Sequence, residues 1–177
     1  MSPRPYNLGA RTAAVAETRQ KVVAAARLLF AESGFHRVSL DEIARRADVA
    51  RATVYHQFGS KLGVLGAVVE DYERRAGLAA LAELVETGPV TTLVRDVVTA
   101  GCRYWSTDPA LARSMIAFAV TDPQAADLLA GHDAGRLRLL TGFAAYDDLA
   151  RGRGLSTARA AELLSGLAEE ALRPAAG

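Results

Sequence analysis

Residues 39–61, SLDEIARRADVARATVYHQFGSK, predict two short helices separated by a tight break, with a third helix starting at the end of the stretch. Ser39 and Glu42 have the spacing of a capping box, and the apolar residues at positions 40–47 recur on one helical face. Asp48 follows this helix, and aspartate tolerates the left-handed backbone that a tight turn requires. Two short helices with such a break are typical of a helix-turn-helix, whose second helix fits a DNA major groove.

The composition indicates a helical protein. Half of the 177 residues are apolar but only 6% are aromatic. Ala and Leu recur throughout, which favours helices over sheet. A chain of this length accommodates one domain or two small ones, at about 100 to 200 residues per domain. We therefore predict an all-α protein.

Helices are expected on both sides of the helix-turn-helix. Apolar residues recur at helical spacing over residues 13–33, and Gly34 then supplies a left-handed position of the kind that commonly ends a helix. Ser60 is a good N-cap for a long fourth helix, whose apolar stripe runs toward Val85. Near its start, Gly63 indicates either a pliable helix or a glycine that is merely tolerated.

The second half of the chain carries further helix signals. Asp108-Pro109 and Asp122-Pro123 each combine a good N-cap with proline at the first helical position, and Ser156 is expected to cap the last helix. Together with helices over residues 92–106 and 134–151, these signals bring the total to about nine helices.

The predicted architecture is a three-helix head, a connecting helix and a C-terminal helical body. We expect a flexible arm at residues 1–12, the helix-turn-helix domain at 13–60, and the connecting helix and body at 61–177. The arm carries Arg4 and Arg11 and could follow a DNA minor groove; the alternative is a disordered tail without function.

The charges are unevenly distributed. Residues 1–61 contain 10 Lys and Arg against 5 Asp and Glu, whereas residues 62–177 contain 11 against 15. Clustered positive charge is typical of a phosphate-binding surface, although a solvated face is an alternative. The two ends of the chain are therefore expected to have different partners.

Other classes of function have little support in the sequence. Cys102 is the only cysteine, which excludes an intramolecular disulfide, and His36, His56 and His132 have no metal-site spacing. Asp147-Asp148 is the nearest approach to a carboxylate pair, but adjacent helical positions point about 100° apart. We expect no catalytic residue, no metal and no cofactor. Without a signal peptide or a membrane span, a soluble, cytoplasmic protein is expected.

Several short motifs of the head, in this order, resemble those of the TetR (tetracycline-repressor-like) family of transcriptional regulators. They are Gly34-Phe35, Val38-Ser39-Leu40-Asp41-Glu42-Ile43-Ala44, Ala47-Asp48-Val49, Thr53-Val54-Tyr55-His56-Gln57-Phe58 and Ser60-Lys61. The similarity covers about residues 13–65. It implies a body that binds a small molecule, and a homodimer formed through the last two long helices.

This chain departs from the family pattern at four positions. Asp48 stands where glycine is common, Gln57 where histidine is frequent and Gly63 where an acidic residue is typical. Ala50 replaces the serine that usually caps the third helix, and alanine is a poor cap. The third helix is therefore expected to start without a side-chain cap.

Phosphate contacts are predicted for polar residues at the helix starts. Ser39, Thr53 and Lys61 are candidates, because a helix N-terminus attracts phosphate oxygens. Capping alone is the alternative for Ser39, and a solvated charge is the alternative for Lys61. The Tyr55 hydroxyl and the Gln57 amide are further candidates, although Tyr55 could instead be a core tyrosine.

Base contacts are predicted for the exposed face and start of the third helix. Arg51, Ala52 and His56 lie there, and an arginine can bind guanine O6 and N7 with two hydrogen bonds. Arg51 is the preferred specificity residue, with a merely solvated charge as the alternative. The expected partner is double-stranded DNA carrying a palindromic operator.

Two further sets of residues are candidates for roles in the body. Large or adaptable side chains that could line a pocket for a small apolar or aromatic effector, or simply pack the core, are Cys102, Trp105, Met115, Phe118, Phe143 and Tyr146. Apolar side chains at helical spacing that could form the homodimer interface are Leu137, Leu140, Ala144, Leu163, Leu167 and Ala168.

Three functions remain open. The sequence favours a homodimeric repressor that a small-molecule ligand releases from its operator. The alternatives are a DNA-binding regulator without such a ligand and a helical interaction protein that has lost DNA binding.

Overall fold

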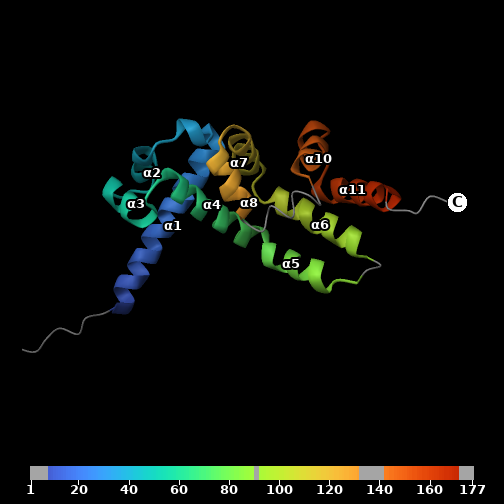
Figure 1. The fold of residues 1–177 in the computed structure, drawn as a ribbon, viewed down its shortest axis with the longest axis horizontal. Coiled ribbons are helices and arrows are strands. Elements are labelled where there is room, and N and C mark those ends of the chain that lie inside the picture. Colours follow the sequence, from blue (N-terminus) through green and yellow to red (C-terminus); the bar gives the residue numbers. More distant parts are fainter. Residues whose placement is uncertain (1–7, 90–91, 132–141, 172–177) are drawn as a thin grey trace, which may run out of the picture. The chain divides into compact units, whose positions relative to one another are not determined.

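The computed structural model describes residues 8–89, 92–131 and 142–171, and within these ranges every regular element is a helix (Figure 1). Ten α-helices are present in the described residues, together with one 3₁₀ turn and one π-helical turn. The predicted all-α class is confirmed. The chain divides into two compact units, Met1–Val68 and Val69–Gly177, which are described separately below.

The first unit contains three helices that form the head. They are α1 (Leu8–Ser33), α2 (Leu40–Arg46) and α3 (Arg51–Phe58), and the 3₁₀ turn η1 (Phe35–Arg37) lies between α1 and α2. Since α1 begins at Leu8, residues 8–12 are helical, and the prediction that they belong to an irregular arm was wrong. The rest of the expected arm lies outside the described residues.

The core of the first unit joins the three helices. Fully buried side chains come from α1 (Val22 and Phe30), α2 (Ile43) and α3 (Val54), and α2 contacts both α1 and α3 (Figure 1). Asp48, in the break between α2 and α3, has φ 54°, so the predicted left-handed turn residue is confirmed. Packing of α2 against both α1 and α3 therefore holds the two short helices in place.

The helix α4 (Lys61–Ala76) contains the division between the two units. Its expected cap is confirmed, because the Gly63 N–H donates to Ser60 Oγ at 3.0 Å. The predicted continuation toward Val85 is wrong: Gly77 adopts a left-handed conformation with φ 72°, and α5 (Leu78–Thr87) starts after it. Within the described ranges, this break accounts for the one helix that the sequence did not predict.

The described helices of the second unit after α5 are α6 (Leu93–Ser106), α7 (Pro109–Thr121), α8 (Pro123–Gly131), α10 (Phe143–Asp147), which leads into the π-helical turn η2 (Asp148–Gly152), and α11 (Thr157–Ala171). The side chains of Asp108, Asp122 and Ser156 each accept the backbone N–H three residues later, as predicted. The expected helix over residues 134–151 is described only from residue 142 onward.

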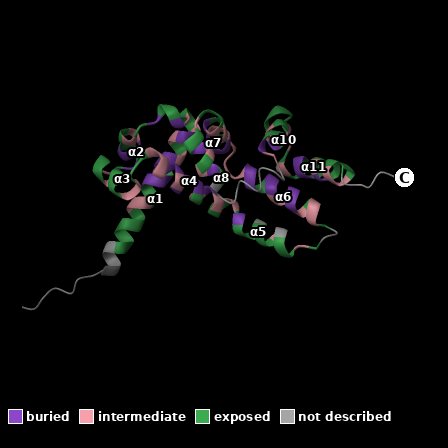
Figure 2. Ribbon diagram, in the orientation of Figure 1, coloured by how far each residue is buried: buried purple, intermediate pink, exposed green. Residues whose placement is uncertain are grey.

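The second unit is built around α6, which contacts α5, α7, α10 and α11. Its buried face is visible in Figure 2 and includes Tyr104 and Trp105. These rings form an edge-to-face series from Tyr72 through Tyr104 and Trp105 to Phe143, with successive centroids 5.0, 4.8 and 5.3 Å apart. The Tyr72 hydroxyl donates to the Tyr104 carbonyl at 2.8 Å, and burial raises the pKa of that hydroxyl.

Replacing Tyr72 by phenylalanine is expected to lower the free energy of unfolding by about 0.5–1.5 kcal/mol, because the Tyr104 carbonyl loses one donor and keeps the Thr107 N–H. Equilibrium denaturation in urea measures this change. Tyr55→Phe is the matched control, since the Tyr55 side chain is 61% exposed and should tolerate the loss of its hydroxyl. Equal stabilities of the two variants would contradict the structural role of the Tyr72 hydroxyl.

Candidate functional site

The start of α2 is fixed by a complete capping box. Ser39 Oγ accepts the Glu42 N–H at 3.2 Å, and the Ser39 N–H donates to Glu42 Oε2 at 2.7 Å. These hydrogen bonds hold the pKa of the Glu42 carboxyl below its usual value. The Ser39 hydroxyl also lies 2.9 Å from Glu42 Oε2, so the free protein uses this hydroxyl for capping.

The outer face of α3 is open to solvent. Arg51, Ala52, Tyr55 and His56 are exposed, whereas Val54 is completely buried (Figure 2). The alternative that Tyr55 is a core residue is therefore wrong. The helix also starts as expected, because Ala50 provides no side-chain cap.

Arg51 is not an isolated charge. Its Nη1 lies 3.3 Å from Asp41 Oδ2 of α2, and both side chains are about two-thirds exposed (67% and 63%). Exposed ion pairs contribute only about 0–1 kcal/mol to stability. A base could therefore replace Asp41 as the partner of Arg51 at small cost.

The other two polar candidates on α3 are partly enclosed. Thr53 and Gln57 are half-buried, although the sequence predicted that only one edge of the helix would be buried. The buried Gln57 Oε1 has no hydrogen-bond partner within the described ranges. The Gln57 amide is thus less accessible to a phosphate than its helical position implied.

Lys61 makes contacts that the sequence did not reveal. Its Nζ donates to the carbonyls of Phe35 and Val38, both at 2.9 Å, and lies 4.2 Å from the centroid of the Phe35 ring. Burial lowers the pKa of this ammonium, and the nearby Glu42 opposes the effect. In the free protein the Lys61 ammonium is bound by these two carbonyls and is not merely solvated, so it ties η1 to the start of α4.

Gly63 is required by close packing. A Cβ at this position would lie 2.0 Å from the Phe58 carbonyl oxygen, which is far closer than van der Waals contact. The first turn of α4 therefore lies against the last turn of α3. Neither pliability nor simple tolerance, the two interpretations that the sequence allowed, explains this glycine.

Comparison with known proteins supports the assignment of this head as a helix-turn-helix domain. The sequence model described as "Bacterial regulatory proteins, tetR family" matches residues 22–68. Residues 22–68 therefore form a TetR-family domain. The resemblance predicted from the motifs is confirmed for these residues, which comprise the core of α1, the helix-turn-helix and the start of α4.

Two curated relatives illustrate the extent of the similarity. The HTH-type transcriptional regulator SrpR of Pseudomonas putida is 48% identical over 60 residues, which are 33% of this chain and 28% of SrpR. The HTH-type transcriptional repressor BdcR of Escherichia coli (strain K12) is 27% identical over 111 residues, which are 62% of this chain and 56% of BdcR. The chain thus matches less than two thirds of the length of either relative.

The similarity in fold extends into the body. A solved transcriptional regulator from Aquifex aeolicus VF5 aligns with 88% of this chain and 99% of its own, with a TM-score of 0.63 and 13% identity. At that identity the comparison shows the fold alone. The head carries the sequence similarity, and the body shares the arrangement of helices.

The six effector candidates predicted from the sequence lie in the core of the body. All are less than 9% exposed: Cys102, Trp105, Met115, Phe118, Phe143 and Tyr146. Burial raises the pKa of the Cys102 thiol to about 11, so this thiol is uncharged at neutral pH. Trp105 and Phe143 pack directly against each other. These six side chains therefore pack the core, which was the alternative interpretation of the sequence.

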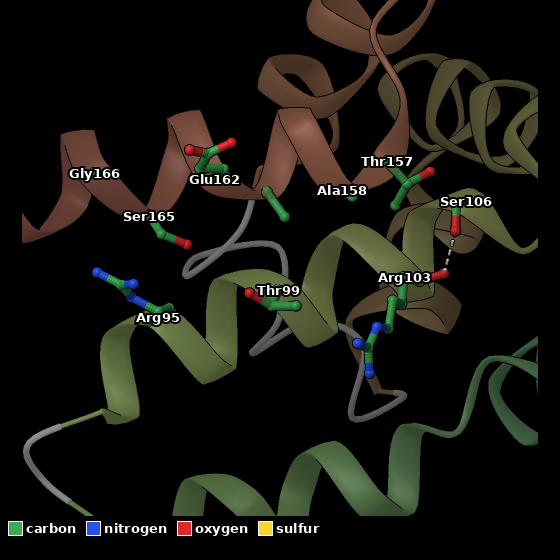
Figure 3. A pocket seen from close by; sticks show the side chains of 10 residues that line it. Arg95, Thr99, Arg103, Ser106, Thr157, Ala158, Glu162, Ser165 and Gly166 are labelled. Carbon is green, nitrogen blue, oxygen red and sulfur yellow. Dashed lines mark hydrogen bonds between the residues drawn. The ribbon is translucent and has the colours of Figure 1, made fainter.

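A groove of about 800 Å³ lies between α6 and α11, and none of those six side chains lines it (Figure 3). Its walls carry polar groups from both helices, including Thr99, Arg103 and Ser165. The prediction of an apolar cavity relied on large side chains, whereas this groove is lined by small and polar ones.

The dimerisation candidates fall into three groups. Leu137 and Leu140 lie outside the described residues. Leu163 and Leu167 on α11 are 37% and 68% exposed and stand one turn apart. Ala144 is exposed and Ala168 is half-buried. The described part of the set thus includes an exposed apolar strip on α11.

The described residues also bear on metal sites and membrane spans. Among them, no group of three or more His, Cys, Asp and Glu side chains could hold a metal ion. No helix in the same ranges combines the length and apolar character needed to cross a membrane.

Lys61→Met is expected to lower the free energy of unfolding by about 1–2 kcal/mol, because two carbonyls lose a charged donor that is partly exposed to solvent. Lys21→Met is the matched control, since Lys21 forms only an exposed ion pair with Glu17 and its loss should leave stability unchanged. Chemical denaturation compares the two. The opposite result would be a Lys61→Met protein of unchanged stability whose DNA affinity depends less steeply on salt concentration, by about one phosphate contact. That result would show that Lys61 binds phosphate.

Proposed function

We propose that this chain is a TetR-family DNA-binding transcriptional regulator that acts as a homodimer on a palindromic operator. The observation that carries the proposal is the exposed face of α3, which holds Arg51, Ala52, Tyr55 and His56 on a helix whose last turn packs closely against α4. The net positive charge of residues 1–61 supports attraction to phosphates. A helix so presented fits a major groove.

Each candidate has a distinct role in this proposal. Arg51 reads a guanine after leaving Asp41, with Ala52 and His56 beside it. The hydroxyl groups of Ser39, Thr53 and Tyr55, with the Gln57 amide and Lys61, position the helix on phosphates. For Ser39, Gln57 and Lys61, DNA contact requires a change from the partners or burial that each has in the free protein.

Repression with release by a small molecule is the proposed mode of action. It is supported by the name of BdcR, a transcriptional repressor, and by a groove of ligand size in the body. A regulator without an effector is the second candidate. An interaction protein that does not bind DNA is less well supported, because the recognition face of α3 is open and flanked by charged groups.

Homodimerisation is proposed through the exposed apolar strip of Leu163 and Leu167 on α11, with Ala168 of the same helix and Ala144 of α10 as further candidates. A two-fold axis would bury this strip against its own copy. It would also present two copies of α3 to successive major grooves, about 34 Å apart. Palindromic operator symmetry follows from the symmetry of the dimer.

Selection of bound duplexes from a random DNA pool is expected to recover a palindrome. With Arg51→Ala, base preference should relax at one position of each half-site by about 1–3 kcal/mol, because the bidentate contact is lost. Arg37→Ala, an exposed arginine on η1, should retain the preference and serves as the control. Absence of any enriched sequence with the wild-type chain would favour the interaction protein.

The double variant Leu163→Asp, Leu167→Asp is expected to sediment as a monomer, because four like charges would be buried in the two-fold interface. Wild type should sediment as a dimer. Val120→Asp is the control, since Val120 on α7 is 78% exposed but lies outside the proposed interface. A wild-type monomer at every concentration would refute the dimer.

A further inference from the structure

We infer that the groove between α6 and α11 binds a small organic carboxylate, and that this ligand is the effector; only its role as effector rests on the proposed function. The two helices run antiparallel along the groove. Ser106 at the end of α6 lies near Thr157 at the start of α11, and Arg95 near the start of α6 pairs with Glu169 near the end of α11 (Figure 3). Its volume of about 800 Å³ falls within the range of small-molecule sites, about 300–1,000 Å³.

Ser165 supplies an unsatisfied hydrogen-bonding group in the groove. It is only 3% exposed, and its Oγ has no hydrogen-bond partner in the described part of the chain. Figure 3 shows its side chain pointing from α11 toward α6. Leaving a buried hydroxyl unpaired costs free energy, which a ligand that bonds to this hydroxyl would recover.

The charges of the groove favour an anion. The Arg95 guanidinium is bound by both oxygens of Glu169, at 3.0 Å each, and Glu162 is paired with Arg159 at 2.5 Å. Arg103 also lines the groove and is exposed, and no ion pair joins it to any residue that the structure describes. The groove therefore has one positive charge that its own carboxylates leave uncompensated.

The chemistry of these groups specifies a carboxylate. A guanidinium matches the two oxygens of a carboxylate with parallel hydrogen bonds, and hydroxyl groups such as those of Ser165 and Thr99 bind further polar atoms of the same ligand. An uncharged apolar effector would leave both Arg103 and Ser165 without a partner. The groove thus differs in ligand class from the aromatic core beside it.

The proposed dimer interface leaves this groove accessible. At 100° per residue along an α-helix, Leu163 and Leu167 each lie about 160° from Ser165 around α11. One face of α11 therefore meets α6 and the ligand, and the opposite face carries the apolar strip. The same helix can take part in both interactions without competition.

Thermal unfolding of the full chain with 3-hydroxybenzoate, 6-hydroxyhexanoate and succinate, each of which carries a second polar group, and with the corresponding neutral amides, tests the proposal directly. At least one carboxylate should raise the Tm while its amide does not, and titration calorimetry should then give its Kd. Arg103→Gln is expected to weaken that Kd about tenfold or more, since it removes a charge-assisted contact. Ser165→Ala should weaken binding and raise the Tm of the ligand-free protein.

Arg153→Gln is the matched control, because Arg153 is an exposed arginine paired with Asp148 outside the groove, and it should leave the Kd unchanged. Failure of all three acids to stabilise the protein, equal stabilisation by inorganic phosphate, or an unchanged Kd in Arg103→Gln would overturn the inference. Because these measurements need no DNA, they succeed or fail independently of operator binding. Release of the operator by the same acid then tests its role as effector.

Discussion

The hydrogen bonds from the Lys61 ammonium to the carbonyls of Phe35 and Val38 are the contact on which the recognition surface depends. They join the turn before α2 to the first residue of α4, and α3 lies between these two points in the chain. The close approach of Gly63 to the Phe58 carbonyl fixes the last turn of α3 against α4. The C-terminal end of α3 is thus held by its neighbours, whereas its start has no side-chain cap from Ala50, and Arg51 there forms an exposed ion pair with Asp41 of α2.

The sequence predicted those features that local rules decide. Capping by Ser39, Ser60 and Ser156, and the left-handed turn at Asp48, follow from residue types at fixed spacing. The break at Gly77 was missed, because an apolar stripe of helical period can continue from one helix into the next across a single left-handed residue. Local pattern therefore gives element type more reliably than element ends.

The candidate site was predictable only where it depends on one helix. Helical periodicity separates the exposed residues of α3 from buried Val54, and the family resemblance adds their role. The partners of Lys61 lie 26 and 23 residues away, and sequence spacing carries no information about such a contact. Large side chains such as Trp105 suggested a pocket, but they pack against one another. A cavity is what packing leaves empty, so residue size alone cannot locate it.

The unpaired hydroxyl of Ser165 also indicates how a ligand could act beyond its own site. A ligand shifts a conformational equilibrium only through its different affinity for the two states. Arg95 and Glu169 already join α6 to α11 at the surface, while Ser165 weakens the same contact from inside. A carboxylate that satisfies Ser165 and Arg103 together would stabilise the arrangement of α6 against α11 seen here. Since α6 also contacts α5, α7 and α10, that stabilisation would extend to most of the body.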